Sequence, residues 1–158
     1  MKHKRILSVR VKRDVDTDPD LSWLGEYSST PKGKDVIDRQ ERGDMGRGEY
    51  RYFTPAMTGE QTGNPDSPEQ DYARMETYNR ANWCMLGIWA EAEVQTHNCG
   101  VIQKIRSGGL WGVENDSDAA YLATVAHEEL AALASELEAM DFTKRQIKAA
   151  LANPEVLA

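Results

Sequence analysis

The chain has 158 residues, of which 40% are hydrophobic and 28% are charged, and its formal net charge is −7. This length and composition suit a folded domain with a real core and exclude wholesale disorder. The negative charge argues against nonspecific binding to nucleic acid or to an anionic membrane, because phosphate contacts require clustered Lys and Arg. No segment approaches the roughly 18 apolar residues of a membrane span, and the basic N-terminus precedes an apolar run too short for a signal peptide. We expect one domain over residues 1–158, located in the cytoplasm.

The first half of the chain predicts short strands separated by polar segments. Residues 5–11 alternate between apolar and polar side chains, as in a strand with one wet face. Residues 28–48 show neither helical nor strand periodicity, so we expect a flexible loop. Residues 50–54 contain β-formers and end before a proline, which is typical of an edge strand. A Ser-Pro pair then starts a helix expected over residues 67–81.

The second half contains the clearest strand pattern and the best helix. Residues 84–94 alternate strictly, and the runs 101–106 and 110–114 are separated by glycine turns, which indicates an antiparallel meander. Residues 117–152 are expected to form a C-terminal helical hairpin. The apolar stripe of its first helix consists of Leu122, Ala126, Leu130, Leu133, Leu137 and Met140. The predicted fold is a two-layer α+β domain with an antiparallel sheet of four or five strands, one long acidic helix and two shorter helices.

The segment 107–143 has eight carboxylates and no Lys or Arg, although the chain carries 19 basic residues. Its candidate partner-binding residues are Glu114, Asp116, Asp118, Glu129 and Glu136. At 100° per residue, Asp118, Glu129 and Glu136 lie within about 20° of one another beside the apolar stripe. Such a row can imitate a run of phosphates and occupy the nucleic-acid channel of a basic protein. The alternative is that these glutamates form the ordinary solvated surface of a soluble helix.

A second candidate surface is the polar face of the strand at residues 84–94. Trp89 lies on this face together with Glu91 and Glu93. Tryptophan is enriched at the centres of protein interfaces, so we expect Trp89 to face a partner. The same face would suit a homodimeric adaptor protein.

The remaining motifs do not define a reaction or a cofactor. The acidic segment 14–20 has the acid spacing of a calcium loop, but Pro19 and Gly25 occupy the positions that an EF-hand reserves for Gly and Glu. The glycine-rich segment 43–48 lacks the preceding strand and the Lys of a phosphate loop. We therefore expect no catalytic residue and no cofactor. An alternative is that the protein is a small enzyme or a nucleotide-binding protein, with its site between these two segments.

Cysteine usage argues against a disulfide framework. Cys84 and Cys99 are the two cysteines of the chain, and we expect both to be reduced. With His97 they make three soft ligands without a fourth, so we expect no metal site.

Five segments of the sequence resemble a family of small proteins found in phages, prophages and plasmids. They are DPDLSWLGEY (18–27), GEYRYF (48–53), YNR (78–80), WCMLGI (83–88) and GGLWGVE (108–114). The resemblance spans most of the chain and implies a mobile-element setting, in which accessory proteins often block host defences, as anti-CRISPR and anti-restriction proteins do. With the acidic helix, this implies a stoichiometric inhibitor that binds a basic host protein or nucleoprotein complex, such as a defence nuclease or a CRISPR effector subunit, without contacting nucleic acid directly. The alternatives are a small phage enzyme or nucleotide-binding protein, and a homodimeric adaptor.

Overall fold

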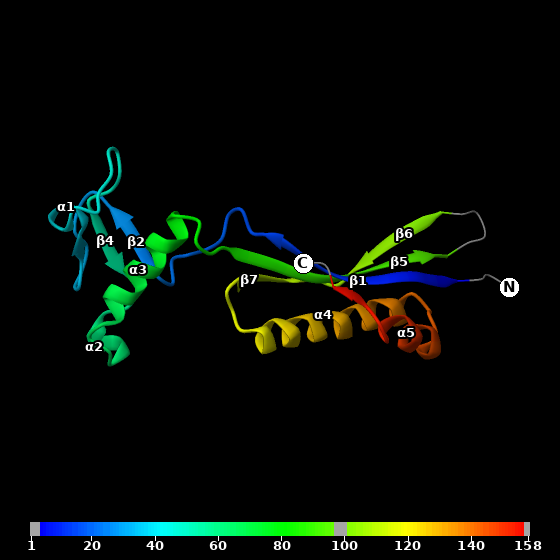
Figure 1. The fold of residues 1–158 in the computed structure, drawn as a ribbon. Helices are drawn as coiled ribbons and strands as arrows, with labels where there is room; N and C mark the ends of the chain where they lie inside the picture. Colours follow the sequence, from blue (N-terminus) through cyan, green and yellow to red (C-terminus); the bar gives the residue numbers. More distant parts are fainter. Residues whose placement is uncertain (1–3, 97–100, 157–158) are drawn as a thin grey trace. The chain divides into compact units, whose positions relative to one another are not determined.

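The structure is a computed structural model that describes residues 4–96 and 101–156. The chain is mixed α+β, as predicted, and the described part contains five helices and a five-stranded sheet (Figure 1). Contacts within the chain define two compact units: unit 1 comprises residues 1–17 and 84–158, and unit 2 comprises residues 18–83. Each unit has its own sheet and its own buried residues.

The sheet of unit 1 is built around two long strands, β1 (Arg5–Val15) and β5 (Met85–Gln95), which pair antiparallel. Two shorter strands, β6 (Ile102–Arg106) and β7 (Leu110–Glu114), both pair antiparallel with the other edge of β5. The fifth strand, β8 (Glu155–Val156), pairs parallel with β1. The sheet has five strands, within the predicted number, but it is not wholly antiparallel because the chain returns to β1 after its last helix.

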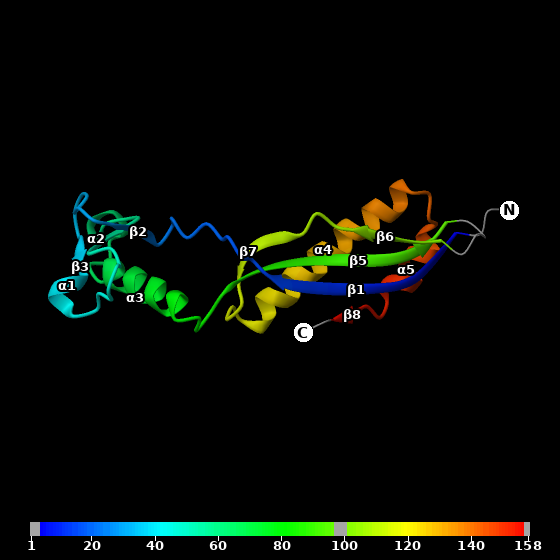
Figure 2. The ribbon, with the colours of Figure 1, turned by 90° about the horizontal axis from the view of Figure 1, so that it is seen from above.

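Two helices, α4 (Ala119–Ala139) and α5 (Lys144–Leu151), lie on the same face of this sheet (Figure 1). The buried residues between helices and sheet form two clusters: Val9, Ala90, Ala92, Val94, Leu133, Leu137, Phe142 and Ile147; and Val11, Leu86, Ile88, Val113 and Val125. The strict alternation of β5 explains this arrangement, because successive side chains of a strand point to opposite faces. Figure 2 looks onto the other face of the sheet, with α4 and α5 behind the strands. Among the described residues of unit 1, no helix covers that face.

Unit 2 has a three-stranded sheet in the order β2 (Gly25–Ser28), β4 (Tyr52–Pro55), β3 (Ile37–Asp38). Its helices are α1 (Arg39–Arg42), α2 (Gly59–Thr62) and α3 (Ser67–Asn79). Phe53 is fully buried and packs against the rings of Tyr27 and Tyr72, with centroid distances of 5.3 Å in both cases. This aromatic cluster joins the sheet to α3.

Two expectations for this part of the chain differ from the structure. The strand β4 was predicted at a sheet edge but is the central strand. Its proline, which has no N–H to donate, is tolerated because Pro55 is the last residue of β4 and β3 pairs only with Tyr52 and Phe53. The segment 28–48, expected to be a loop, contains β3 and α1. The Asp38 carboxylate caps α1, and Gly43 ends it in the left-handed conformation.

Candidate functional site

The carboxylates predicted to form a row on α4 occupy different settings. Asp118 is the N-cap residue of the helix, and its side chain accepts a hydrogen bond from the backbone N–H of Tyr121 at 2.8 Å. Glu129 accepts a hydrogen bond from the backbone N–H of Gly109 at 3.0 Å, which ties α4 to the turn before β7. Glu136 is exposed. Asp118 and Glu129 therefore stabilise the fold through backbone hydrogen bonds, and Glu136 faces solvent.

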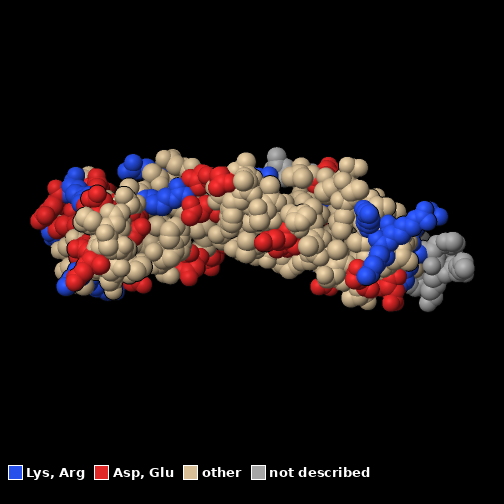
Figure 3. All heavy atoms as spheres, turned by 90° about the horizontal axis from the view of Figure 1, so that it is seen from below, with Lys and Arg blue, Asp and Glu red and all other residues tan. Residues whose placement is uncertain are grey.

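The other carboxylates of the acidic segment lie at the start of α4 and along its outer surface. Glu114 is half-buried at the end of β7, and Asp116 is exposed in the turn that follows. Glu128 and Glu138 on α4 are exposed. Figure 3 shows the face of unit 1 that α4 and α5 form: Asp and Glu side chains are spaced along α4, with uncharged surface between them, and Lys and Arg side chains gather over α5. The negative surface thus ends where α5 begins.

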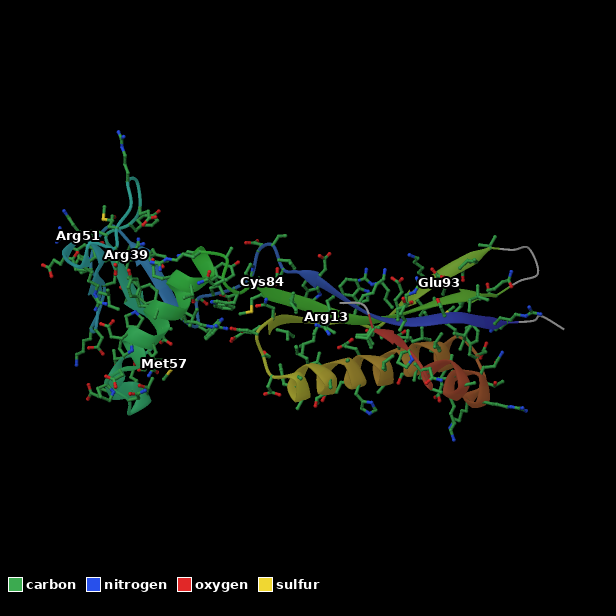
Figure 4. All side chains as sticks on the ribbon, in the orientation of Figure 1. Arg13, Arg39, Arg51, Met57, Cys84 and Glu93 are labelled. Carbon is green, nitrogen blue, oxygen red and sulfur yellow. The ribbon has the colours of Figure 1, made fainter. Side chains whose placement is uncertain are left out.

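The open face of the sheet in unit 1 carries an ion-pair network that joins three strands. Glu91 is 6% exposed, and its Oε1 lies 3.3 Å from Lys12 Nζ and 3.6 Å from Lys104 Nζ. Glu93, labelled in Figure 4, is half-buried, and its Oε1 lies 3.5 Å from Arg10 Nη1. Both glutamates expected to face a partner are thus engaged with basic side chains of neighbouring strands.

Trp89 lies in the same face but is largely covered. Its ring stacks beside that of Trp111, with centroids 6.2 Å apart and planes 20° apart, and the Arg106 guanidinium lies 4.8 Å above its centroid. Its Nε1 is buried and has no hydrogen-bond partner among the described residues. Trp111 is 49% exposed, so the outward aromatic side chain of this face is Trp111 and not Trp89.

Trp111 lies flat on the sheet because the strand beneath it has a glycine. A Cβ atom added to Gly87 would lie only 2.4 Å from Cε3 of the Trp111 ring. The pairing of β5 with β7 shifts register between Leu86 and Ile88, so β7 carries an extra residue at this point. The bulge aims Trp111 across β5, and sequence alternation alone could not show it.

Replacing Gly87 by Ala is expected to push the Trp111 ring off the sheet and to lower the free energy of unfolding by about 1–3 kcal/mol, the usual cost of overpacking. Urea denaturation followed by tryptophan fluorescence measures this change. Gly108→Ala is the matched control, because an added Cβ there meets no atom within 4 Å. Equal stability of the two variants would contradict the described position of Trp111.

Unit 2 contains a cavity of about 450 Å³ beside a buried arginine. Arg39, labelled in Figure 4, is 5% exposed and donates hydrogen bonds to Glu49 at 2.7 Å and to Glu76 at 3.1 Å. The hydroxyl of Tyr27 donates to Glu76 at 2.7 Å, and burial together with this carboxylate raises the pKa of Tyr27. The polar groups at the base of the cavity are therefore paired with one another.

The glycine-rich segment 43–48 contributes to the wall of this cavity through Asp44 and Gly46. The backbone N–H of Gly46 and the Arg39 guanidinium both donate to Glu49 and hold the pKa of that carboxyl below its usual value. The acidic segment 14–20, expected to form the other side of a nucleotide site, contributes no lining residue.

The described residues meet the requirements neither of a metal site nor of a membrane-spanning helix. These residues contain no group of three or more His, Cys, Asp or Glu side chains that could hold a metal ion, and no helix long and apolar enough to cross a membrane. Cys84 is half-buried, whereas His97 and Cys99, weighed with it as zinc ligands, lie outside the described residues. Comparisons with protein-family models, with curated proteins and with solved structures find no match.

Proposed function

We propose that this protein is a stoichiometric inhibitor of a host nucleic-acid-directed defence complex, of the anti-CRISPR or anti-restriction type, and that it acts in the cytoplasm of the host cell. The observation that supports this proposal is the segregation of charge, because eight carboxylates and no Lys or Arg lie in the segment 107–143. Most of that segment is the helix α4. A rigid helix displays its charges at fixed spacing, which favours both the affinity and the association rate for a basic surface.

The contact residues on α4 follow from their exposure. Glu128, Glu136 and Glu138 are exposed, whereas Asp118 caps the helix and Glu129 binds the backbone of Gly109. In the described residues, the side chains of the three exposed glutamates accept no such hydrogen bond from a backbone N–H. We assign the contact with the partner to them, together with Asp116 at the start of the helix.

The partner in this proposal is a basic groove of a defence nuclease or of a CRISPR effector subunit, which would otherwise hold nucleic acid. Carboxylates in place of phosphates would compete for the same Lys and Arg side chains. Charge attraction of this kind weakens as salt is added, because the Debye length falls to about 8 Å at physiological ionic strength. Inhibition should therefore depend on both the exposed carboxylates and the ionic strength.

Reversing two of these charges, in the variant Glu128→Lys/Glu136→Lys, is expected to abolish inhibition while the fold is kept. The measurement is the plating efficiency of a phage on cells with an active CRISPR or restriction system, with and without the protein. The matched control is Glu26→Lys/Glu60→Lys in unit 2, which changes the net charge equally at two other exposed positions. Glu129 is left intact because its carboxylate also holds Gly109.

Each result decides one part of the proposal. Full inhibition by the α4 variant would remove the acidic helix as the binding element. Absence of protection by the wild-type protein, with no nuclease or effector subunit bound to it on purification from these cells, would remove the inhibitor function itself.

A further inference from the structure

We propose that the open face of the sheet in unit 1 binds single-stranded nucleic acid, with a base stacked on Trp111 and phosphates held by the surrounding Lys and Arg side chains. This inference goes beyond the inhibitor function and does not depend on it. It rests on the strand register, which gathers basic residues that are far apart in the sequence. These residues are Arg10 and Lys12 on β1 and Lys104 and Arg106 on β6.

The register places these side chains around the tryptophan pair. Arg10 and Arg106 lie on either side of Glu91, and Lys12 lies directly opposite Trp89. All of them share the face of β5 that points away from α4 and α5. The chain as a whole is acidic, and the sheet nevertheless brings four basic residues together on this face.

Trp111 has the geometry of a stacking platform. Its ring lies over Gly87 and beside Trp89, so one ring surface is packed, and the side chain is nevertheless 49% exposed. A ring fixed in this way loses little conformational freedom when a base stacks on it. Base–aromatic stacking of this kind is the main sequence-tolerant contact in single-strand binding proteins.

The charge of the outer layer of this face also fits a phosphate backbone. Lys12 and Lys104 share a single carboxylate oxygen, Glu91 Oε1, and Glu91 is itself almost fully buried beneath them. Arg106 lies over the Trp89 ring, and no carboxylate of the described residues is within ion-pair distance of it. Arg10 is paired with Glu93 and with Glu155, so the cations of this face that remain for phosphates are Arg106 and the two lysines that share Glu91.

The surroundings of Trp111 favour nucleic acid over a protein partner. The centre of a protein interface is apolar and depleted in charge, whereas the neighbours of the tryptophan pair on this face are charged: Arg106 over Trp89, Lys12 opposite Trp89, and Asp14 opposite Gly87. An aromatic ring flanked by cations is the pattern that binds bases and phosphates together.

The test is fluorescence anisotropy of labelled oligonucleotides of about ten nucleotides, dT and rU, added to the full chain at low salt. Trp111→Ala is expected to weaken binding about 10-fold, and Trp111→Phe to retain most of it, because a phenyl ring still stacks. The matched control is Trp23→Ala, since Trp23 is 48% exposed but belongs to unit 2. The dT and rU arms show whether DNA or RNA is preferred.

A second pair of variants tests the charge contribution. Lys104→Glu/Arg106→Glu is expected to remove binding and its salt dependence, whereas Lys144→Glu/Lys148→Glu on α5 changes the net charge equally and should retain both. The proposal is overturned if the wild type binds neither oligonucleotide, or if Trp111→Ala and Trp23→Ala bind equally well. It is also overturned if Trp111→Ala abolishes concentration-dependent self-association and leaves oligonucleotide binding unchanged, because the face would then be a homodimer surface.

Discussion

Replacing Arg39 by Met is expected to lower the free energy of unfolding of unit 2 by about 3–5 kcal/mol, because the largely buried Glu76 carboxylate loses its close cation and keeps only Arg80, at 3.9 Å. Arg39 is 5% exposed, and Glu76, to which it donates at 3.1 Å, is 13% exposed. The same guanidinium donates to the backbone carbonyl of Tyr50 at 2.9 Å and to the hydroxyl of Tyr72 at 3.3 Å. One side chain therefore connects α1, α3 and the segment before β4.

The control for this prediction lies three residues away in the same helix. Arg42→Met removes an arginine that, like Arg39 over Tyr27, lies over a tyrosine ring and pairs with a glutamate, Glu69. The side chains of that pair are 38% and 54% exposed, so the expected loss is at most about 1 kcal/mol. Hydrogen exchange of the unit 2 amides measures both variants, and equal losses would mean that burial of Arg39 contributes nothing.

A second variant separates the missing cation from the missing packing. Glu76→Gln added to Arg39→Met removes the carboxylate charge that the first change left with Arg80 alone, at 3.9 Å. The double variant is expected to be more stable than Arg39→Met alone, because the desolvation cost of Glu76 disappears. If it is less stable, the loss comes from the hydrogen bonds of Arg39 and not from the orphaned carboxylate.

The fold could be predicted where a segment is long enough to show a period. The alternation over residues 84–94 corresponds to β5, and Thr143 with Gln146 three residues later, a pattern visible in the sequence, forms the capping box at the start of α5. The apolar stripe of α4 was also right, although Val125 was missed. By contrast, β3 has two residues and α1 has four, so neither can show a period. These short elements are held by tertiary contacts, such as those of Arg39, that no local pattern reveals.

The candidate sites were predictable in composition but not in environment. Alternation placed Trp89 and Glu91 on the polar face of β5, and the register agrees with that. It could not show that Trp111 and Arg106, from later strands, would cover Trp89. The helical hairpin was expected to begin at residue 117, and the N-cap of α4 is Asp118. The carboxylate expected in the acidic row therefore accepts a hydrogen bond from the Tyr121 backbone N–H at the helix N-terminus.

Replacing Leu133 by Ala is expected to lower the free energy of unfolding of unit 1 by about 3–5 kcal/mol, in the upper part of the range for such deletions. Leu133 is fully buried in the cluster that includes Ala90 and Ala92 of β5. Alanine side chains cannot move to fill the space, so the cavity should persist. The change in urea midpoint at constant slope measures the loss.

Leu122→Ala is the matched control, because it deletes the same atoms from the same helix at a half-buried position. Its expected loss is smaller by at least about 1 kcal/mol, since less apolar surface returns to water and the site is open to solvent. Similar losses in the two variants would contradict the described packing of α4 on β5.

The Leu133 variant also separates the stability of α4 from its charge. All of the exposed carboxylates of α4 are kept, so partner binding should survive at temperatures where the variant is still folded and should disappear with the unfolding of unit 1. The charge-reversed variant Glu128→Lys/Glu136→Lys should behave in the opposite way, with a stable fold and no binding. If binding instead persisted after unit 1 had unfolded, the carboxylates would act without the helix that spaces them, and the rigid display of charge would not be the basis of recognition.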